Sequence, residues 1–511
     1  MKIQFLVLLA SITTFSQTLV LDPTFGNNGI VKSTFTNDIY SFVTSVAIQE
    51  NGKIITCGYQ SSSTMHVRIV MIRYNSDGSI DDSFGTDGIV ILSQGEIVPH
   101  YNGNMSVKIV NDDQILLVAN SRISSTSPDE VLLARYNNDG SLDLDFGNNG
   151  IVLIPNTGGV RKIEVQADDK IVITGTFNSR FLKVLRVNPD GSLDETFGIN
   201  GMVTINFCLT SASNCFSFST CCKILNDGQI LIGGFYNSDI NSELLQFAIA
   251  KLNANGSLDT NFGQNGMITS NFGDGIQMSN LLVNDQNEII ALGIIHPYDP
   301  QGLKIGLAKF DYLGNPIFDF GFEGKVTTQI NPLVAYDALQ DIVLTNEGKL
   351  LGVGFTTTAY ATASDSLLVQ YTTDGSLDAS FGTNGVQTFD LDTETLFEGM
   401  RTIDLLPNDK ILIGGYIDHQ FALVRLVDQN LGVSSTSKAN FSIFPNPTKD
   451  ILNIKNDQEI DAVIISDVLG KRVFEKVENT TQINVSKLQQ GIYFMQIQSQ
   501  GKTFTQKFIK E

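Results

Sequence analysis

Residues 77–88 read Asp77-Gly78-Ser79-Ile80-Asp81-Asp82-Ser83-Phe84-Gly85-Thr86-Asp87-Gly88, and close copies of this stretch recur along most of the chain. Each of seven copies has a Phe followed directly by Gly, with a second Gly four positions after the Phe. Six copies also have an Asp three residues before the Phe, and the sixth copy has Ile317 there. The Phe residues, spaced 51 to 65 positions apart, are Phe25, Phe84, Phe146, Phe197, Phe262, Phe320 and Phe381. The chain therefore contains an internal repeat of about 60 residues, which overrides a domain count based on length.

Each repeat unit is predicted to contain four strands. In the first unit, alternating apolar residues and Gly, Asn or Asp turns predict strands at residues 30–35, 42–49, 53–57 and 66–74. The unit is expected to begin at the short strand after the second Gly, as in 30–84. Four strands repeated seven times predict an all-β fold, a seven-bladed β-propeller of four-stranded blades over residues 17–428.

A basic residue ends the fourth strand in six of the seven units, at Arg73, Arg135, Arg186, Lys251, Lys309 and Arg425. We interpret it as one partner of a structural ion pair at the surface, with a carboxylate of a turn, rather than as part of a binding site. The repeated Phe residues are predicted to pack between adjacent blades, because the chain has no Trp to act as a large aromatic wedge. The flanking Gly residues suit tight turns with positive φ.

The two ends of the chain differ from the repeats. Residues 1–16 are predicted to be a signal peptide, with Lys2 before an apolar segment and cleavage near Ser16. Residues 429–440 form a Ser-rich linker, and short strands in 441–511 predict a small Ig-like β-sandwich. No later segment has the roughly 18 consecutive apolar residues of a membrane span.

The net charge makes some binding partners less favourable, and the cysteines bear on the disulfides expected in an exported protein. The formal net charge is −21 and resides in residues 1–440, which makes nucleic acid and anionic membranes poor candidates as partners. Four cysteines lie close together, at Cys208, Cys215, Cys221 and Cys222. In an exported protein we expect a disulfide from Cys208 to Cys215 or Cys221, rather than a metal site, because adjacent cysteines without a nearby His do not match zinc spacing.

Two family resemblances follow from these motifs. The repeat, over residues 19–428, resembles the delta-60 repeat of exported bacterial proteins, which implies a propeller without an assigned activity. The C-terminal block resembles the type A sorting domain of type IX secretion cargo in Bacteroidetes. The matching positions include Pro445, Asn446, Pro447, Gly470, Gly491, Tyr493, Lys507 and Phe508. The second resemblance implies that the type IX machinery is a partner, and that the protein passes through the periplasm to the cell surface or the medium.

The chemistry of the repeats is less specific. Asp77, Asp81, Asp82 and Asp87 are weak calcium candidates, because they offer oxygen ligands at close spacing. An Asx turn explains the same residues without an ion, so no cofactor is expected. The four His residues show no metal or catalytic-triad spacing.

We therefore predict a non-enzymatic ligand-binding or adhesion module. Irregular insertions at 60–65, 121–130, 237–243, 296–302 and 356–366 are expected on the face opposite the Asp-Gly stretches, where a glycan or protein could bind. The alternative is a secreted carbohydrate-active enzyme with acidic residues at the propeller axis. A third hypothesis, a structural envelope component, predicts no soluble ligand.

Overall fold

In the computed structural model the chain divides into two compact units, residues 1–429 and 430–511. The predicted signal peptide and almost all of the predicted linker lie outside the residues that the structure describes. Among those residues, none of the elements is a helix with the length and apolar character needed to cross a membrane. The structure describes residues 17–35, 38–62, 67–92, 105–121, 130–155, 157–177, 181–208, 215–237, 245–297, 302–330, 335–358, 364–391, 398–429, 441–456, 460, 462–467, 471–477, 481–499 and 502–511.

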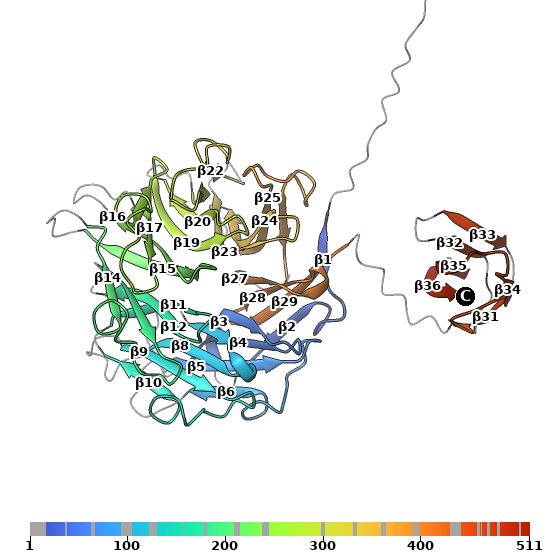
Figure 1. The fold of residues 1–511 in the computed structure, drawn as a ribbon, viewed down its shortest axis with the longest axis horizontal. Coiled ribbons are helices and arrows are strands. Elements are labelled where there is room, and N and C mark those ends of the chain that lie inside the picture. The colour runs from blue at the N-terminus through green and yellow to red at the C-terminus, as the bar shows by residue number, and fades with distance from the viewer. Residues whose placement is uncertain are drawn as a thin grey trace, which may run out of the picture. The chain divides into compact units, whose positions relative to one another are not determined.

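The first unit is built from antiparallel sheets arranged in a ring (Figure 1). Its described residues form seven sheets, whose inner strands contact one another in a closed circle. From the inner to the outer strand, six sheets contain β3 (Asp38–Ile48), β4 (Ile54–Ser62), β5 (Val67–Tyr74) and β6 (Ile89–Leu92); β7 (Ser106–Ile109), β8 (Ile115–Ser121), β9 (Glu130–Tyr136) and β10 (Ile151–Ile154); β11 (Gly159–Val165), β12 (Ile171–Phe177), β13 (Phe181–Val187) and β14 (Met202–Ile205); β15 (Ser217–Ile224), β16 (Ile230–Asn237), β17 (Leu245–Leu252) and β18 (Met267–Ser270); β19 (Gly275–Val283), β20 (Ile289–His296), β21 (Lys304–Phe310) and β22 (Lys325–Thr328); and β23 (Ala335–Leu344), β24 (Leu350–Thr358), β25 (Ser364–Tyr371) and β26 (Val386–Phe389).

The seventh sheet joins the two ends of the unit. It contains β27 (Glu398–Leu405), β28 (Ile411–Ile417) and β29 (Gln420–Asp428), and β29 also pairs with β1 (Leu19–Leu21) and β2 (Ile30–Ser33). Two short 3-10 turns, η1 (Asn111–Asp113) and η2 (Pro407–Asp409), precede second strands. The all-β propeller prediction is confirmed.

The sheets are offset from the predicted repeat units by one strand. The short strand after the second Gly does not start a sheet; it is the outer strand of the preceding one, as β6 pairs with β5. The reason is local, because the Asp-Gly stretch is a tight turn that reverses the chain and returns it alongside the strand it has just left. The predicted start of each unit was therefore wrong by one strand, and β2 completes the last sheet of the ring.

The repeated stretch packs as a fixed unit of Asp, Arg and Phe. In the first intact copy, Arg73 Nε donates to Asp81 Oδ2 over 2.6 Å, and the guanidinium carbon lies 4.7 Å from the centre of the Phe84 ring. Arg73 Nη1 also donates to the backbone oxygen of Asn138 in the next copy. The copies centred on Arg135, Arg186 and Arg425 repeat this arrangement. The predicted ion pair with a turn carboxylate is present, but it is largely buried rather than at the surface, and its arginine also contacts the next copy.

All seven Phe rings are at most 1% exposed, which confirms their predicted burial. The turns beside them explain why the motif tolerates so few residue types. Gly85, Asp87 and Gly88 all have positive φ, and Asn, Asp or Glu occupies the position of Asp87 in every copy. A Cβ on Gly85 would lie 2.4 Å from the backbone oxygen of Ile89, so only glycine fits there.

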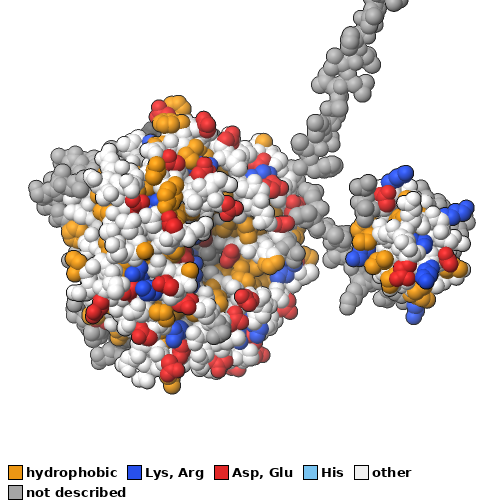
Figure 2. Space-filling model, in the orientation of Figure 1, with side chains coloured by type: hydrophobic (Ala, Val, Ile, Leu, Met, Phe, Trp, Pro, Cys, Tyr) orange, Lys and Arg blue, Asp and Glu red, His pale blue; other side chains and the backbone are white. Residues whose placement is uncertain are grey.

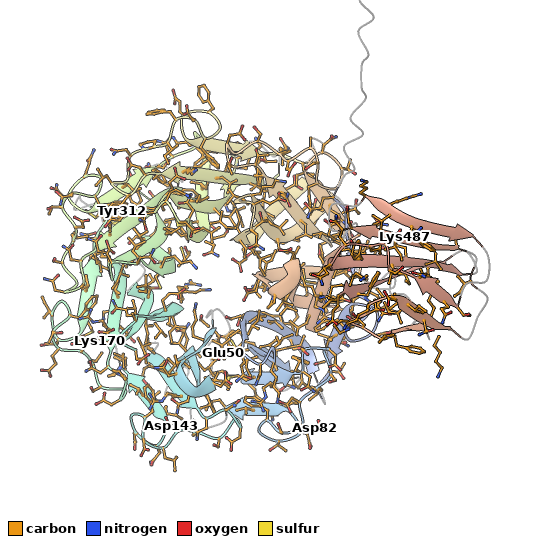
Figure 3. All side chains as sticks on the ribbon, turned by 45° about the vertical axis from the view of Figure 1, so that its right-hand side comes forward. Glu50, Asp82, Asp143, Lys170, Tyr312 and Lys487 are labelled. Carbon is orange, nitrogen blue, oxygen red and sulfur yellow. A yellow bond between two sulfur atoms is a disulfide. The ribbon has the colours of Figure 1, made fainter. Side chains whose placement is uncertain are left out.

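Three copies keep the ion pair with different residues. Ile317 removes the turn carboxylate of the sixth copy, and Lys309 pairs over 2.7 Å with Glu288 instead. Lys251 replaces Arg in the fifth copy, where its ammonium lies 3.1 Å from the centre of the Tyr312 ring. Gln370 replaces Arg in the seventh copy and donates to Asp378, which Lys349 also contacts. Figure 3 shows Tyr312 at the rim of the ring, together with Asp82, Asp143 and Lys170.

A second ring of contacts runs through the backbone. In six copies the N–H of the Gly after Phe donates to a carbonyl in the turn of the next copy, as Gly85 does to Asp139. The seventh copy has no following turn, and Gly382 donates to the carbonyl of Gln17 over 2.8 Å. The N-terminal segment therefore supplies both the missing strand and the missing turn.

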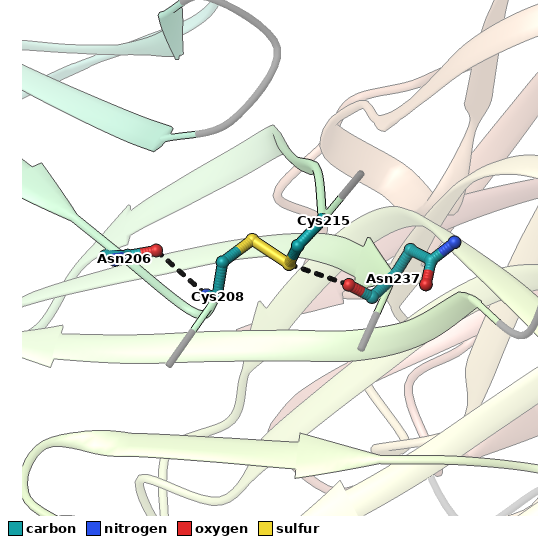
Figure 4. Close-up of a disulfide and its surroundings, with 4 residues drawn as sticks. All are labelled: Asn206, Cys208, Cys215 and Asn237. Carbon is teal, nitrogen blue, oxygen red and sulfur yellow. Dashed lines mark hydrogen bonds between the residues drawn. A yellow bond between two sulfur atoms is a disulfide. The ribbon is translucent and has the colours of Figure 1, made fainter. Parts of the chain in front are cut away.

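Cys208 and Cys215 form a disulfide, with Cα atoms 5.8 Å apart, in the link between β14 and β15 (Figure 4). This settles which of the two predicted pairings forms. Among the described cysteines, Cys57, Cys221 and Cys222 are free and buried. Burial raises the pKa of the Cys221 thiol to about 11, so it is not a reactive thiolate at neutral pH.

The second unit contains two sheets that share one core. One sheet has β30 (Phe441–Phe444), β31 (Ile451–Asn456) and β34 (Gln482–Asn484). The other has β33 (Arg472–Val477), β32 (Ala462–Asp467), β35 (Gly491–Ser499) and β36 (Lys502–Lys510). Leu452 from the first sheet packs in one cluster with Ile465, Met495 and Phe508 from the second. The unit is thus a small β-sandwich.

Acid is expected to destabilise the propeller through its turn carboxylates. Burial alone would raise the pKa of Asp81, but hydrogen bonds from Lys53 and Ser83 and the charge of Arg73 hold that pKa well below its usual range. Such a group stabilises the fold above its unfolded pKa of about 3.9, and this contribution is lost as the pH falls through the lower folded value. We expect the urea concentration at the midpoint of unfolding to be independent of pH above about pH 5 and to fall below about pH 4. Tyrosine fluorescence follows the unfolding of the propeller, because all tyrosines except Tyr493 lie in residues 1–429.

The variant Asp81→Asn should lower the free energy of unfolding at pH 7 by about 2 kcal/mol, because it removes a charge-assisted pair. It should also make the decline in acid less steep. The matched control is Asp82→Asn, which changes an exposed neighbour by the same one charge and should leave both properties unchanged. An equally steep acid decline in Asp81→Asn would contradict this account.

Removing the disulfide with Cys208→Ser and Cys215→Ser together should lower the free energy of unfolding by about 2.5 kcal/mol, the entropy of closing so short a loop. Urea unfolding of the full chain measures the loss. Reductant should bring the wild type to the stability of the double variant and have no effect on the variant itself. A wild type that is insensitive to reductant would count against the prediction.

Candidate functional site

The calcium candidates lie in the first intact copy of the repeated stretch, where protein donors occupy two of them. Asp77 Oδ1 accepts from the N–H and the hydroxyl of Ser79, at 2.9 and 2.7 Å. Asp81 accepts from Lys53, Arg73 and Ser83. Asp82 and Asp87 are exposed. In the part of the chain that the structure describes, no three His, Cys, Asp or Glu side chains form a metal-binding group.

The sorting-motif residues meet at one end of the sandwich. Asn446, between Pro445 and Pro447, accepts from the N–H of Ile509 over 2.9 Å and donates to the carbonyl of Lys507 over 3.2 Å. The Tyr493 and Phe508 rings stack with their centres 5.6 Å apart, and Gly491 begins β35 with positive φ. Gly470 lies outside the described residues. The first strand and the last are thereby tied together, with Pro445, Asn446 and Pro447 exposed.

The predicted recognition loops connect second strands to third strands, so they lie at the end of each sheet opposite the Asp-Gly turns. Of these insertions, residues 63–66, 122–129, 238–244, 298–301 and 359–363 fall outside the described residues. The site that the structure does define lies at the centre of the ring, where the enzyme alternative placed acidic residues, but none of its lining residues was predicted.

β-Bulges build this central site. In six inner strands the pairing with the second strand skips one residue, which leaves that residue unpaired. The unpaired residues are Thr44, Arg161, Thr220, Ser279, Gln340 and Arg401. All six line one cavity of about 340 Å³, and Met105, directly before β7 of the remaining sheet, lines it too. We call this space the axial cavity; the face of the propeller shown in Figure 2 is hollowed at the centre of the ring.

Basic and polar side chains dominate the wall of the axial cavity. Arg161, Lys162 and Arg401 contribute to it, and Asp341 is the one acidic side chain among its described lining residues. Both oxygens of Asp341 are occupied: Oδ1 by Asn280 and the N–H of Ile342, Oδ2 by the hydroxyl of Thr402 and the N–H of Ile403. Burial lowers the pKa of Lys162, but the charges of Asp341 and Glu164 outweigh it, so the net shift is upward and Lys162 is protonated at neutral pH.

The two arginines of the axial cavity have no carboxylate partner among the described residues, and Arg401 lies against aromatic rings. The guanidinium of Arg401 lies 4.4 Å from the centre of the Phe42 ring and 5.9 Å from that of Tyr416. The Phe42 ring centre is 5.8 Å from that of Tyr59. Burial lowers the pKa of Arg161, with an opposing contribution from Tyr59. Among the described residues, neither arginine forms an ion pair, and the buried Nε of Arg401 has no hydrogen-bond acceptor.

A charged cluster lies three positions further along the inner strands. Glu164 pairs with Lys108 over 2.8 Å and lies 3.9 Å from Lys223. Burial and the charge of Asp341 raise the pKa of Asp404. The enzyme alternative predicted acidic residues at the axis, but Asp341 is the one acidic side chain among the described lining residues of the axial cavity. Successive polar residues inside an apolar strand, such as Arg161 and Lys162, were the signal in the sequence that could have revealed the bulges.

Comparisons with known proteins agree with the two-unit architecture. Residues 442–511 match the family described as secretion system C-terminal sorting domain. Residues 49–84, 111–146, 166–197, 225–262 and 347–381 match a domain of unknown function, DUF5122, described as a beta-propeller. No curated protein matches the sequence.

Solved structures resemble the chain only distantly. PorZ, a surface component of the type-IX secretion system of Porphyromonas gingivalis, is 10% identical with a TM-score of 0.32, over 92% of this chain and 81% of that one. The polysaccharide lyase Uly1 is 10% identical with a TM-score of 0.45, over 75% and 89%. The beta-propeller domain of the Trilobed protease from Pyrococcus furiosus is 8% identical with a TM-score of 0.40, over 79% and 100%. Likeness at this level says nothing about activity.

The sorting domain indicates export by type IX secretion to the cell surface or the medium, which confirms the predicted localisation. The predicted resemblance of the C-terminal block is confirmed, and the repeats are those of a propeller family. The chain thus combines DUF5122 beta-propeller repeats with a secretion system C-terminal sorting domain.

Proposed function

We propose that this exported propeller is a non-enzymatic binding module that receives its ligand in the axial cavity. The observation that carries the proposal is the set of bulge residues from six inner strands, all of which line one space. A bulge interrupts the hydrogen-bonding ladder, and it re-aims a side chain. Six bulges at the same level of one ring favour a built site over a packing irregularity.

The carboxylates near the axis favour binding over catalysis. Glycoside hydrolysis usually requires two carboxyl groups on either side of the scissile bond. Asp341 is the one acidic residue among the described lining of the cavity, and protein donors occupy both of its oxygens. A carboxylate held in this way positions its neighbours, as Asn280 and Thr402, rather than exchanging protons.

One observation favours the enzyme alternative. Asp404 has a raised pKa, and the charge of Asp341 contributes to the shift. Two interacting carboxyl groups with different environments are a recurrent acid and base arrangement. In a carbohydrate-active enzyme, Asp404 would supply the proton and Asp341 the negative charge.

Filling the axial cavity should abolish ligand binding without unfolding the protein. The experiment screens the purified full chain on a glycan array and for polysaccharide hydrolysis, and it compares the wild type with Ser279→Phe, whose new ring would occupy the cavity. The matched control is Thr204→Phe, at an exposed position on the outer strand β14. We expect binding without turnover in the wild type and the control, and loss of binding in Ser279→Phe.

Other outcomes separate the competing hypotheses. Turnover that Asp404→Asn and Asp341→Asn each abolish would establish the enzyme alternative. If Ser279→Phe still binds the ligand, the ligand binds outside the axial cavity, and the proposal is overturned. A folded wild type that binds no glycan on the array and hydrolyses no polysaccharide would favour a structural envelope component.

A further inference from the structure

We propose that the axial cavity selects a negatively charged saccharide, a sugar that carries a carboxylate or sulfate group, with Arg161 and Arg401 as its anion-binding residues. The inference rests on the proposed function and adds the chemistry of the ligand. It runs against the net charge of −21, which on its own favours cationic or neutral ligands.

The first argument is the spare hydrogen-bonding capacity of the two arginines. Elsewhere in the propeller, each strand-end arginine pairs with a turn Asp and donates to a backbone carbonyl. These arginines are Arg73, Arg135, Arg186 and Arg425. Arg161 and Arg401, in contrast, have no ion pair with any carboxylate that the structure describes. A guanidinium holds its donors in a planar fork that fits carboxylate and sulfate oxygens.

The second argument is the aromatic support of Arg401. Its guanidinium lies against the Phe42 ring, which in turn contacts the Tyr59 ring. Stacking on a ring holds a guanidinium flat without neutralising it. The donors are therefore positioned, and the charge remains available to a ligand.

The third argument concerns the rest of the cavity wall. Thr44, Thr220, Ser279, Gln277 and Gln340 present short hydroxyl and amide groups from four inner strands. Such groups can both donate and accept, as the hydroxyls of a sugar require, although the Thr44 and Thr220 hydroxyls already donate to the carbonyls of Cys57 and Gly233 and offer a ligand only their acceptor capacity. Phe235 and Ile294 add apolar surface for the carbon face of a sugar ring. An acidic peptide would use the arginines as well, but its backbone offers one N–H and one C=O per residue, fewer hydrogen-bonding groups than the several hydroxyls of a sugar residue.

Size and screening are consistent with this ligand. A volume of about 340 Å³ is at the lower end for small-molecule sites, so the cavity would take the end of a polysaccharide rather than a long segment. The acidic outer surface repels anions at long range, but at physiological salt that field decays over about 8 Å. Within the cavity the nearest charges decide, and three of the four lining charges are positive.

The test measures the binding of defined probes to the full chain by isothermal titration calorimetry. The probes are an oligosaccharide ending in glucuronate, a sulfated oligosaccharide, their neutral counterparts and a short oligoglutamate peptide. The variants are Arg161→Gln and Arg401→Gln, and the matched control is Arg68→Gln, which removes the same charge at an exposed position of β5. Circular dichroism checks that each variant folds, and Arg401→Lys tests rescue by a point charge.

We expect an acidic oligosaccharide to bind, and each glutamine variant to weaken it by about tenfold or more, the loss of a charge-assisted contact. Arg401→Lys should recover part of the affinity, and Arg68→Gln should leave it unchanged. The glucuronate and sulfate probes show which anionic group the cavity prefers. If a glutamine variant fails to fold, inhibition of wild-type binding by free glucuronate or sulfate gives the same answer.

Three results would overturn the inference. Equal affinity for neutral and acidic sugars, unaffected by the arginine variants, would reject the anionic ligand and leave the proposed binding function standing. Binding of oligoglutamate in preference to every sugar would replace the saccharide by an acidic peptide. Failure of both acidic sugars to bind, while the array finds another ligand that Ser279→Phe blocks, would separate failure of this inference from failure of the proposed function.

Discussion

The ion pair between a strand-end arginine and a turn aspartate, stacked on a buried Phe, is the interaction on which the propeller depends. It does three things at once: it fixes the turn, it covers the aromatic ring, and its second guanidinium nitrogen reaches the backbone of the next copy. Each copy is therefore held by its neighbour. The sixth copy shows how strongly the pair is retained, because Glu288 supplies the carboxylate where Ile317 has removed it. A buried charge left unpaired would be costly, so loss of one partner requires a substitute.

This rigid periphery leaves the centre of the ring free to vary. The outer turns repeat the same few residue types, whereas the six bulge positions are occupied by two Thr, two Arg, one Ser and one Gln. A propeller thus separates the residues that hold it together from those that can meet a ligand. The pairing of Asp341 with Asn280 and Thr402 belongs to the second group and links three neighbouring inner strands around the cavity.

Much of the periphery could be predicted from the sequence, because a motif that packs against copies of itself must repeat. The Phe, the Gly residues, the Asp and the strand-end Arg are all visible in this way. The axial site could not be found by the same reasoning, since its bulge residues share a backbone position and polar character but no single residue type. Alternation of apolar residues predicts a strand but cannot place a bulge, which moves every later side chain to the other face. The one-strand offset of the sheets was missed for a similar reason, because repetition fixes the period of a sequence and not the point where a unit begins.

The closure of the ring by Gln17, β1 and β2 has a consequence for how such proteins change in evolution. Six sheets take their outer strand, such as β6, from the segment directly after an Asp-Gly stretch. The seventh sheet takes β2 from the N-terminal segment. Duplication of one copy would therefore enlarge the circle by a complete sheet and leave the closing contact intact. A break inside the N-terminal segment, in contrast, would open the circle whatever the number of copies. Residues 17–33 would therefore close a ring with any number of sheets. Evolution could change the number of copies without changing this closure.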